Sequence, residues 1–328
     1  MNFLYKSDEA KLWLDSYTQK SLQEAVTPNN RCIDLLDVNN CTAVQYSEPP
    51  CVRLTKEIDG EVEEVTVRVA GILCSKILPP VLGLRSTKPE HVRYVRQFVR
   101  CSGLGSHAFA GQRVIFEQVY AAFVANPCVE QLDDFEFGLY EGHKCVDLHA
   151  RHLTERRYVP SLPHIPFTPD IDPNHALEIA RDTMFIRVED NVVQYSKKIY
   201  EDDGSYSYEP LHPEEFKEGD VVEAVGTFVA FPKGKEGQYC MVFCLRGLTM
   251  LTSVFREDSR IVPNPILNVQ RIEKREVRKK KRVKAPTAQA LKRSFIQYGK
   301  RVEAHRKADS SMGGRDPIKD GGESRMEE

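Results

Sequence analysis

The sequence lacks any long apolar run. Its most apolar stretches, such as residues 69–74, have the length of a β-strand, whereas a helix that crosses a membrane needs about 20 consecutive apolar residues. Charges at Lys6, Asp8, Glu9 and Lys11 interrupt the amino-terminal stretch, so it lacks the apolar core of a signal peptide. We therefore expect a nuclear or cytoplasmic protein that has no membrane partner.

The signatures of common catalytic sites are also missing. The sequence contains no P-loop, no nucleophile elbow, no H-E-x-x-H helix and no pair of carboxylates in an apolar context. We therefore predict no catalytic residue and no cofactor, and we favour a protein that is not an enzyme. An enzyme whose residues converge only in the fold stays open as a third hypothesis.

Cysteine and histidine are present, but in a pattern that argues against disulfides and metal sites. The nine cysteines are an odd number spread along a large chain, whereas disulfide frameworks are typical of small exported domains. Residues 143–152 offer four potential metal ligands, His143, Cys145, His149 and His152. Zinc sites usually combine closely spaced pairs from two segments, and the sequence has no second such pair. We therefore predict reduced thiols and no bound metal.

Positive charge is concentrated near the end of the chain. Residues 271–307 hold 15 lysines and arginines and 3 glutamates, a charge of +12, although the whole chain has a net charge of −2. Residues 308–328 carry −3 and are rich in glycine, aspartate and glutamate, which predicts disorder. The remaining residues carry −11, so the sequence combines an acidic body with a basic arm, residues 271–307.

The basic arm supplies the candidate nucleic-acid-binding residues. Lysine and arginine displace counterions from a phosphate backbone without reading its sequence, and the same charge density is typical of a nuclear-localisation signal. The expected partners are therefore DNA or RNA, a nuclear import receptor, or another protein. Apolar residues recur at helical spacing over 288–302, which predicts a partly helical tail. The candidates are Lys274, Arg275, Arg278, Lys279, Lys280, Lys281, Arg282, Lys284, Lys292 and Arg293.

Hydrophobic spacing predicts helices and one clear hairpin in the first half of the chain. Apolar residues at helical spacing predict helices over 7–25 and 88–100, and length and alanine content favour a third over 113–125. Residues 51–73 predict a hairpin, because two strand-like runs flank Asp59-Gly60. That dipeptide accepts the positive φ angles of a tight turn.

A proline-rich segment divides the predicted fold. Residues 158–173 contain prolines at five positions, and proline neither continues a helix nor pairs within a central strand. The predicted fold class is α+β: a mixed domain over 1–157, this linker, a small antiparallel β-barrel-like domain over 174–260, and a basic, partly helical tail over 261–328.

The predicted β domain has the size of an oligonucleotide-binding (OB) barrel. A hairpin about residues 201–204 precedes strands near 221–231 and 238–251, and all the turns are short. In such barrels exposed aromatic rings stack on bases and cations contact phosphates. The alternative is that the tyrosines and lysines here are ordinary exposed strand residues. The residues concerned are Tyr195, Lys197, Lys198, Tyr206, Tyr208, Lys233 and Lys235.

Three ordered blocks in this region carry a resemblance to other proteins. They are DNVVQY at 190–195, GDVVEAVGTFVAFP at 219–232 and MVFCLRGLTML at 241–251. Together they resemble an uncharacterised protein group of mushroom-forming (basidiomycete) fungi, mainly over residues 175–255. The resemblance implies fungal relatives and a shared C-terminal β domain, and it implies no activity.

These features favour a non-enzymatic nuclear binding module that contacts nucleic acid through its basic arm and its β domain. The alternative is a protein-interaction scaffold whose basic arm serves only as a nuclear-localisation signal.

Overall fold

The computed structural model describes five stretches of the chain and omits the rest. The described residues are 5–23, 31–201, 205–234, 237–258 and 298–299. All ten candidate residues of the basic arm, and the tail over 308–328 that was predicted to be disordered, lie outside them. Among the helices of these stretches, none is long and apolar enough to cross a membrane.

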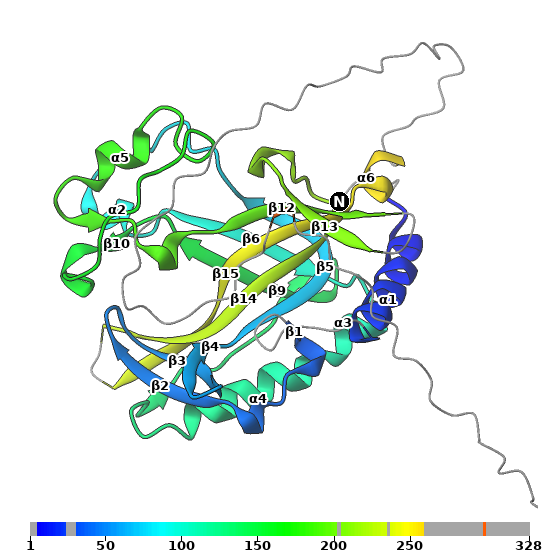
Figure 1. The fold of residues 1–328 in the computed structure, drawn as a ribbon, viewed down its shortest axis with the longest axis horizontal. Coiled ribbons are helices and arrows are strands. Elements are labelled where there is room, and N and C mark those ends of the chain that lie inside the picture. The colour runs from blue at the N-terminus through cyan, green and yellow to red at the C-terminus, as the bar shows by residue number, and fades with distance from the viewer. Residues whose placement is uncertain (1–4, 24–30, 202–204, 235–236, 259–297, 300–328) are drawn as a thin grey trace, which may run out of the picture.

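Five strands close a β-barrel at the centre of the molecule (Figure 1). Around the barrel the order is β5, β6, β9, β15, β14 and back to β5; β9 and β15 are parallel, and the other pairs are antiparallel. Numbered along the chain, the ring runs 1-2-3-5-4, which is the order of an OB barrel. The strands are β5 (Thr66–Ile77), β6 (Arg96–Ser102), β9 (His143–Arg151), β14 (Val221–Pro232) and β15 (Gln238–Thr252). The predicted fold class, α+β with an OB-like barrel, is confirmed.

Aromatic side chains fill the barrel and the space beneath it. Phe116 lies with its ring centroid 5.1 Å from that of Phe228 and 5.4 Å from that of Phe243. A β-carbon at Gly226 would lie 2.5 Å from the Phe243 ring and 3.0 Å from Leu148. Only glycine allows the chain to approach so closely there, and the register of β14 with β15 shifts at the same place.

Two hairpins extend the barrel strands, and the sequence predicted both. The first joins β3 to β4 through Asp59 and Gly60, whose φ angles of 53° and 79° fit the predicted tight turn. The second pairs β12 with β13 and lies beside β15. Together with shorter strands they complete a 13-stranded sheet. The strands concerned are β2 (Thr42–Ser47), β3 (Pro50–Ile58), β4 (Glu61–Glu64), β12 (Gln194–Tyr200) and β13 (Tyr206–Pro210), with β1 (Arg31–Cys32), β7 (Gln131–Leu132) and β8 (Gly138–Tyr140).

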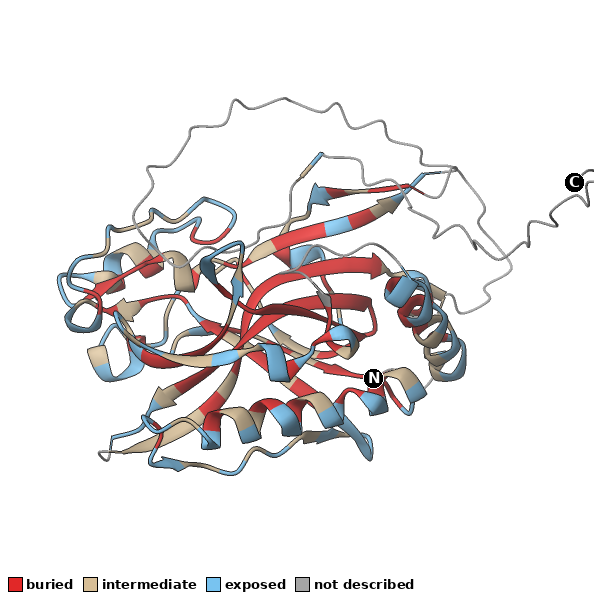
Figure 2. Cartoon of the chain, turned by 60° about the horizontal axis from the view of Figure 1, so that its bottom comes forward, coloured by how far each residue is buried: buried red, intermediate tan, exposed pale blue. Residues whose placement is uncertain are grey.

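Two of the three predicted helices are present. They are α1 (Ser7–Gln23) and α4 (Arg113–Val124), each buried on one face (Figure 2). The predicted helix over 88–100 is wrong, because helix α2 (Pro89–Val92) has only one turn and β6 begins at Arg96. Strand β6 pairs with β5 on one edge and β9 on the other, and these long-range pairings override the local helical spacing. The other helices are α3 (His107–Gly111), α5 (Ala176–Arg181) and α6 (Val254–Asp258).

The proline-rich residues 158–173 do not separate two domains. Three barrel strands precede them and two follow, and Phe116 packs against phenylalanines from beyond them. The predicted division into domains over 1–157 and 174–260 is therefore wrong as a description of the sheet. The segment belongs instead to the long connection between the third and fourth barrel strands, which also holds the small sheet of β10 (Thr154–Glu155) and β11 (Phe185–Ile186). Proline density marked a loop, and it carried no information about which strands pair across that loop.

Candidate nucleic-acid interface

The outer face of barrel strands β6 and β9 carries three cross-strand pairs. Arg96 lies opposite Arg151, Phe98 opposite His149, and Arg100 opposite Asp147. The alternating residues, such as Val99 and Leu148, are buried in the barrel. Because side chains alternate along a strand, these six residues share the outward surface. We call this set the β6–β9 face.

Charge on the β6–β9 face is unevenly neutralised. The Arg100 guanidinium donates two hydrogen bonds of 2.7 Å to the Asp147 carboxylate, so the charges of these two side chains neutralise each other. Arg96 and Arg151 are exposed. Within the described stretches, neither of them has a carboxylate partner. Two arginines at one end of the face therefore remain available for an anionic ligand.

Phe98 is the aromatic centre of the β6–β9 face. The guanidinium carbons of Arg96 and Arg100 lie 6.0 and 5.9 Å from its ring centroid, one on each side along the strand. On the neighbouring strand β5, Ile77 pairs with Phe98 and is 62% exposed. The ring thus lies between cations, beside an exposed apolar side chain.

His149 contributes a flat ring and no charge at neutral pH. Burial, together with the positive charges of Arg96 and Arg151, lowers the pKa of His149 from 6.5 to about 4. The imidazole therefore remains neutral beside the two arginines, and the face presents two planar rings flanked by guanidinium groups.

The loop between β5 and β6 borders this face. It carries the exposed side chains of Arg85, Lys88 and Tyr94, and Tyr94 is 67% exposed two residues before Arg96. In OB barrels, strands 2 and 3 and the loop between strands 1 and 2 form the ligand surface. The cations and aromatic rings of this protein therefore occupy the surface that this barrel type uses.

Most of the tyrosines and lysines considered for an aromatic and basic surface are buried. Tyr195, Tyr206, Tyr208 and Lys198 are each exposed by 8% or less, so their predicted role at an exposed surface is wrong. Of the remaining candidates, Lys197 is exposed, Lys233 forms an ion pair with Asp133, and Lys235 lies outside the described residues.

Lys198 belongs to a closed cluster of charged and aromatic groups. Its ammonium lies 3.9 Å from the ring centroid of Tyr206 and donates to the Tyr17 hydroxyl at 3.3 Å. Tyr17 in turn donates to Glu223 at 2.8 Å, and Glu223 pairs with Arg68 at 3.3 Å. Each charge has a partner, so this cluster joins α1 and β12 to the barrel.

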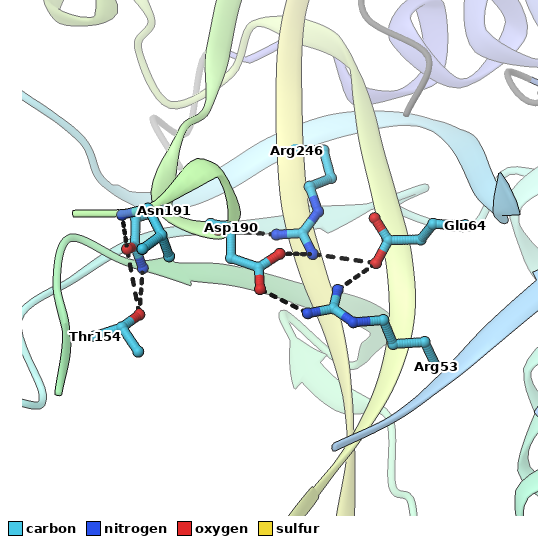
Figure 3. A network of polar contacts seen from close by, with 7 residues as sticks. Arg53, Glu64, Thr154, Asp190, Asn191 and Arg246 are labelled. Carbon is cyan, nitrogen blue, oxygen red and sulfur yellow. Dashed lines mark hydrogen bonds and ion pairs between the residues drawn. The ribbon is translucent and has the colours of Figure 1, made fainter. Parts of the chain in front are cut away.

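A second buried network links the β3–β4 hairpin to β15 (Figure 3). The Arg53 guanidinium lies 2.5 Å from a Glu64 carboxylate oxygen and 2.6 Å from Asp190. Arg246 lies 3.4 Å from the same Glu64 oxygen and 3.1 Å from Asp190. Two arginines and two carboxylates therefore form a neutral set that joins three separate segments.

The histidine and cysteine cluster does not assemble into a metal site. His143 is exposed at the start of β9, Cys145 is buried opposite Ser102, and His152 is buried beyond the end of β9. His149 lies on the β6–β9 face. Within the described residues, no three histidine, cysteine or acidic side chains are grouped to hold a metal ion.

His152 should make stability fall as the pH falls. Burial, with the nearby charge of Arg187, lowers its pKa from 6.5 to about 3, so the folded state holds it neutral. Below pH 6.5 the unfolded chain binds a proton at this histidine and the folded chain does not. The free energy of unfolding therefore falls by roughly 1.4 kcal/mol per pH unit until the pH reaches about 3. His149 acts in the same direction down to pH about 4.

Urea unfolding of His152→Asn between pH 7.5 and 4.5 tests this expectation. The variant should show a shallower loss of stability below pH 6.5 than the wild type, by roughly 1.4 kcal/mol per pH unit. The control His91→Asn, at an exposed position, should keep the wild-type slope. Equal slopes in the wild type and His152→Asn would contradict the expectation.

The chain beyond the basic arm's charged run returns to the body. The Gly299 amide donates to the Tyr208 carbonyl at 3.0 Å, and the Tyr298 hydroxyl donates to the Tyr195 carbonyl at 3.1 Å. Tyr298 also packs against the buried cluster of Tyr206, Tyr208 and Val225. The run from 274 to 293 is therefore preceded by α6 and followed by an anchor on β12 and β13.

The sequence carried a signal for the β6–β9 face that the helix prediction obscured. Arg96, Phe98 and Arg100 alternate with inward residues, a period of two that is typical of a strand. Of the partners on β9, only His149 was considered in the sequence, as one of four potential metal ligands. Only the register between the strands shows that Arg151 and His149 join the same surface.

Comparison with known proteins gives only weak structural likenesses, among them two phage proteins. No family model and no curated protein matches the chain. The crystal structure of gp2.5, a single-stranded DNA binding protein encoded by bacteriophage T7, covers 62% of this chain and all of its own, with 11% identity and a TM-score of 0.29. A C-terminally truncated single-stranded DNA-binding protein from bacteriophage Enc34 covers 65% of this chain and 94% of its own, with 12% identity and a TM-score of 0.28. At these scores the assignment of the barrel depends on its own strand order, and the resemblance to a fungal group stays a prediction.

Proposed function

We propose that the protein binds single-stranded nucleic acid across the β6–β9 face. The observation that carries the proposal is the pairing of Phe98 with His149 and of Arg96 with Arg151 on strands 2 and 3 of a five-stranded barrel. A base has an aromatic face that stacks on a flat side chain, and a phosphate is attracted to an unpaired guanidinium. The site offers both within two cross-strand pairs.

The chemistry of the face favours single strands of any sequence. Stacking contributes about 1–3 kcal/mol per base in such sites and tolerates every base, because each has an aromatic face. In duplex DNA the bases are stacked on one another and their faces are covered. Specificity for sequence needs side chains that hydrogen-bond to base edges. In this proposal Phe98 and His149 stack on bases and the two arginines contact phosphates, so no side chain is assigned to a base edge.

Titration of the full chain with a fluorescent oligothymidine tests this proposal. We expect binding that weakens linearly in a plot of log affinity against log salt concentration, with about 0.7 units of slope for each phosphate contact. A duplex of the same length should bind more weakly at equal salt. Absence of binding at low salt, or a clear preference for the duplex, would contradict the proposal.

The basic arm has a second role in this proposal, as a source of phosphate contacts and as a nuclear-localisation signal. Its candidate residues, including Lys279, Lys280, Lys281 and Arg282, lie outside the described residues, so the support comes from their charge density. Deleting the arm would also remove the anchor at Tyr298. Substitutions within the arm therefore make the cleaner experiment.

Reversing these four charges to glutamate should abolish nuclear accumulation of a tagged protein and reduce the salt dependence of oligonucleotide binding. The matched control exchanges lysine and arginine at the same positions, which preserves the charge and should preserve both properties. If import is lost while affinity and salt slope are unchanged, the arm acts only as a localisation signal. That result would favour the second candidate function, in which the arm is only a nuclear-localisation signal and the body alone binds nucleic acid.

A further inference from the structure

A cavity lies at the end of the barrel away from Arg96 and Arg151. Its volume is about 310 Å³, and it lies between the start of β9, the end of β6 and the helices α3 and α4. A volume of this size is at the small end of the range for ligand pockets. The residues that line it include Phe109, Phe137 and Val146 as apolar members, and Gln112, Arg113 and Lys144 as polar ones.

Gln112 is the unusual member of this lining. It is 2% exposed, and its amide oxygen Oε1 is buried without a hydrogen-bond partner among the described residues. Buried polar atoms in proteins nearly always have a partner. Gln112 lines the cavity. Because its Oε1 is closed to solvent, the amide has to turn toward the cavity before an N–H group of a ligand can satisfy it.

Cations lie on the rim of the same cavity. Lys144 is exposed, and its ammonium lies 5.6 Å from the centroid of the Phe137 ring. His143 is exposed beside it, and Arg113 pairs with Glu117 at 2.5 Å. Within the described stretches Lys144 has no carboxylate partner, so one positive charge is free beside an aromatic wall.

Three glycines belong to the wall of the cavity. Gly103, Gly105 and Gly142 all line the cavity. A β-carbon at Gly103 would lie 2.4 Å from Phe109, so any other residue there would push this phenylalanine from its place. The wall of the cavity thus depends on glycine at a position where a side chain would not fit.

We propose that this cavity binds one nucleotide. The base would lie against Phe109 and Phe137 and donate an N–H to Gln112 Oε1, and the phosphate would lie near Lys144. Every natural base carries an N–H or NH₂ donor, and its flat apolar faces suit a phenylalanine-lined site. The aromatic wall and the buried acceptor match the flat face and the N–H edge of a base, and the cation at the mouth matches a phosphate.

The nucleotide could come from two sources with this chemistry, free in solution or as the terminal nucleotide of a bound strand. The second source rests on the proposed function, and the first is independent of it. Competition separates them: an oligonucleotide that displaces a bound mononucleotide identifies the strand end as the source, whereas simultaneous binding identifies a free nucleotide.

Calorimetric titration of the full chain with the four ribonucleoside monophosphates tests the proposal. We expect at least one to bind, and Gln112→Leu to weaken its binding at least tenfold because the acceptor is lost. Lys144→Glu should also weaken binding of the monophosphate. The parent nucleoside, which has no phosphate, should bind this variant as tightly as it binds the wild type. The control Gln19→Leu, at an exposed position of α1, should bind as the wild type does.

Thermal unfolding without ligand provides the second readout. If Gln112 serves a ligand, Gln112→Leu should be at least as stable as the wild type, because the unpartnered acceptor is removed. A less stable variant with unchanged nucleotide affinity would make Gln112 structural and overturn the proposal. Absence of binding by all four monophosphates at millimolar concentration would also overturn it, even if the oligonucleotide still binds the β6–β9 face.

Discussion

Glu64→Gln should lower the free energy of unfolding by roughly 3–5 kcal/mol, the range seen when one member of a buried ion pair is removed. Glu64 is fully buried, and both Arg53 and Arg246 depend on its carboxylate. The substitution keeps the shape of the side chain and removes its charge. Two buried guanidinium groups would then share the single carboxylate of Asp190, leaving one positive charge uncompensated in the protein interior.

The measurement is urea unfolding at pH 7.5, compared with Glu57→Gln. Glu57 lies on the same hairpin but is exposed, so its neutralisation should change the free energy of unfolding by no more than about 0.5 kcal/mol. A loss below about 1 kcal/mol for Glu64→Gln would contradict the closed network as drawn. Because Asp190 also accepts from Arg53 and Arg246, a large loss would show that the hairpin, β15 and the long connection are stabilised together.

Arg96→Glu combined with Arg151→Glu should weaken binding of single-stranded oligothymidine at least tenfold at low salt. The two side chains lie opposite each other, exposed, on neighbouring strands. Each reversal removes an attraction to phosphate and adds a repulsion. The slope of log affinity against log salt concentration should become shallower by about 0.7 for each phosphate contact that is lost.

The matched control is Lys20→Glu combined with Lys197→Glu. These lysines are exposed on α1 and β12, away from the β6–β9 face, and their reversal changes the net charge by the same amount. We expect the control to lose little affinity and to keep the wild-type slope. Equal losses in the two double variants would show that total charge governs binding, which would contradict a site on β6 and β9.

The sequence predicted local features of the fold well and long-range ones poorly. The turn at Asp59-Gly60, the pairing of β12 with β13 and the pairing of β14 with β15 all join segments close in the chain, and all are confirmed. The barrel closes through β5 with β14 and β9 with β15, across many intervening residues. Composition and periodicity do not contain that information, so the division at residues 158–173 was wrong.

The candidate site was missed for a related physical reason. A strand is buried or exposed according to its neighbours. Tyr206 and Tyr208 are core residues because they form a cluster with Val225 of β14, against which Tyr298 packs. Conversely, Phe98 and Arg96 reached the surface because β6 is a strand, although apolar spacing predicted a helix there. The register of two strands, and not the type of residue, decides which cations lie beside which ring.

Photochemical crosslinking of the full chain to an oligonucleotide that carries 5-iodouracil tests the central claim most directly. Iodouracil reacts with an aromatic side chain that stacks on it, and mass spectrometry identifies the residue. We predict a crosslink to Phe98 within the peptide that includes β6, lost in Phe98→Leu and suppressed by excess unlabelled oligothymidine. Crosslinks confined to the basic arm or to the β12–β13 hairpin, with none on β6 or β9, would contradict the account.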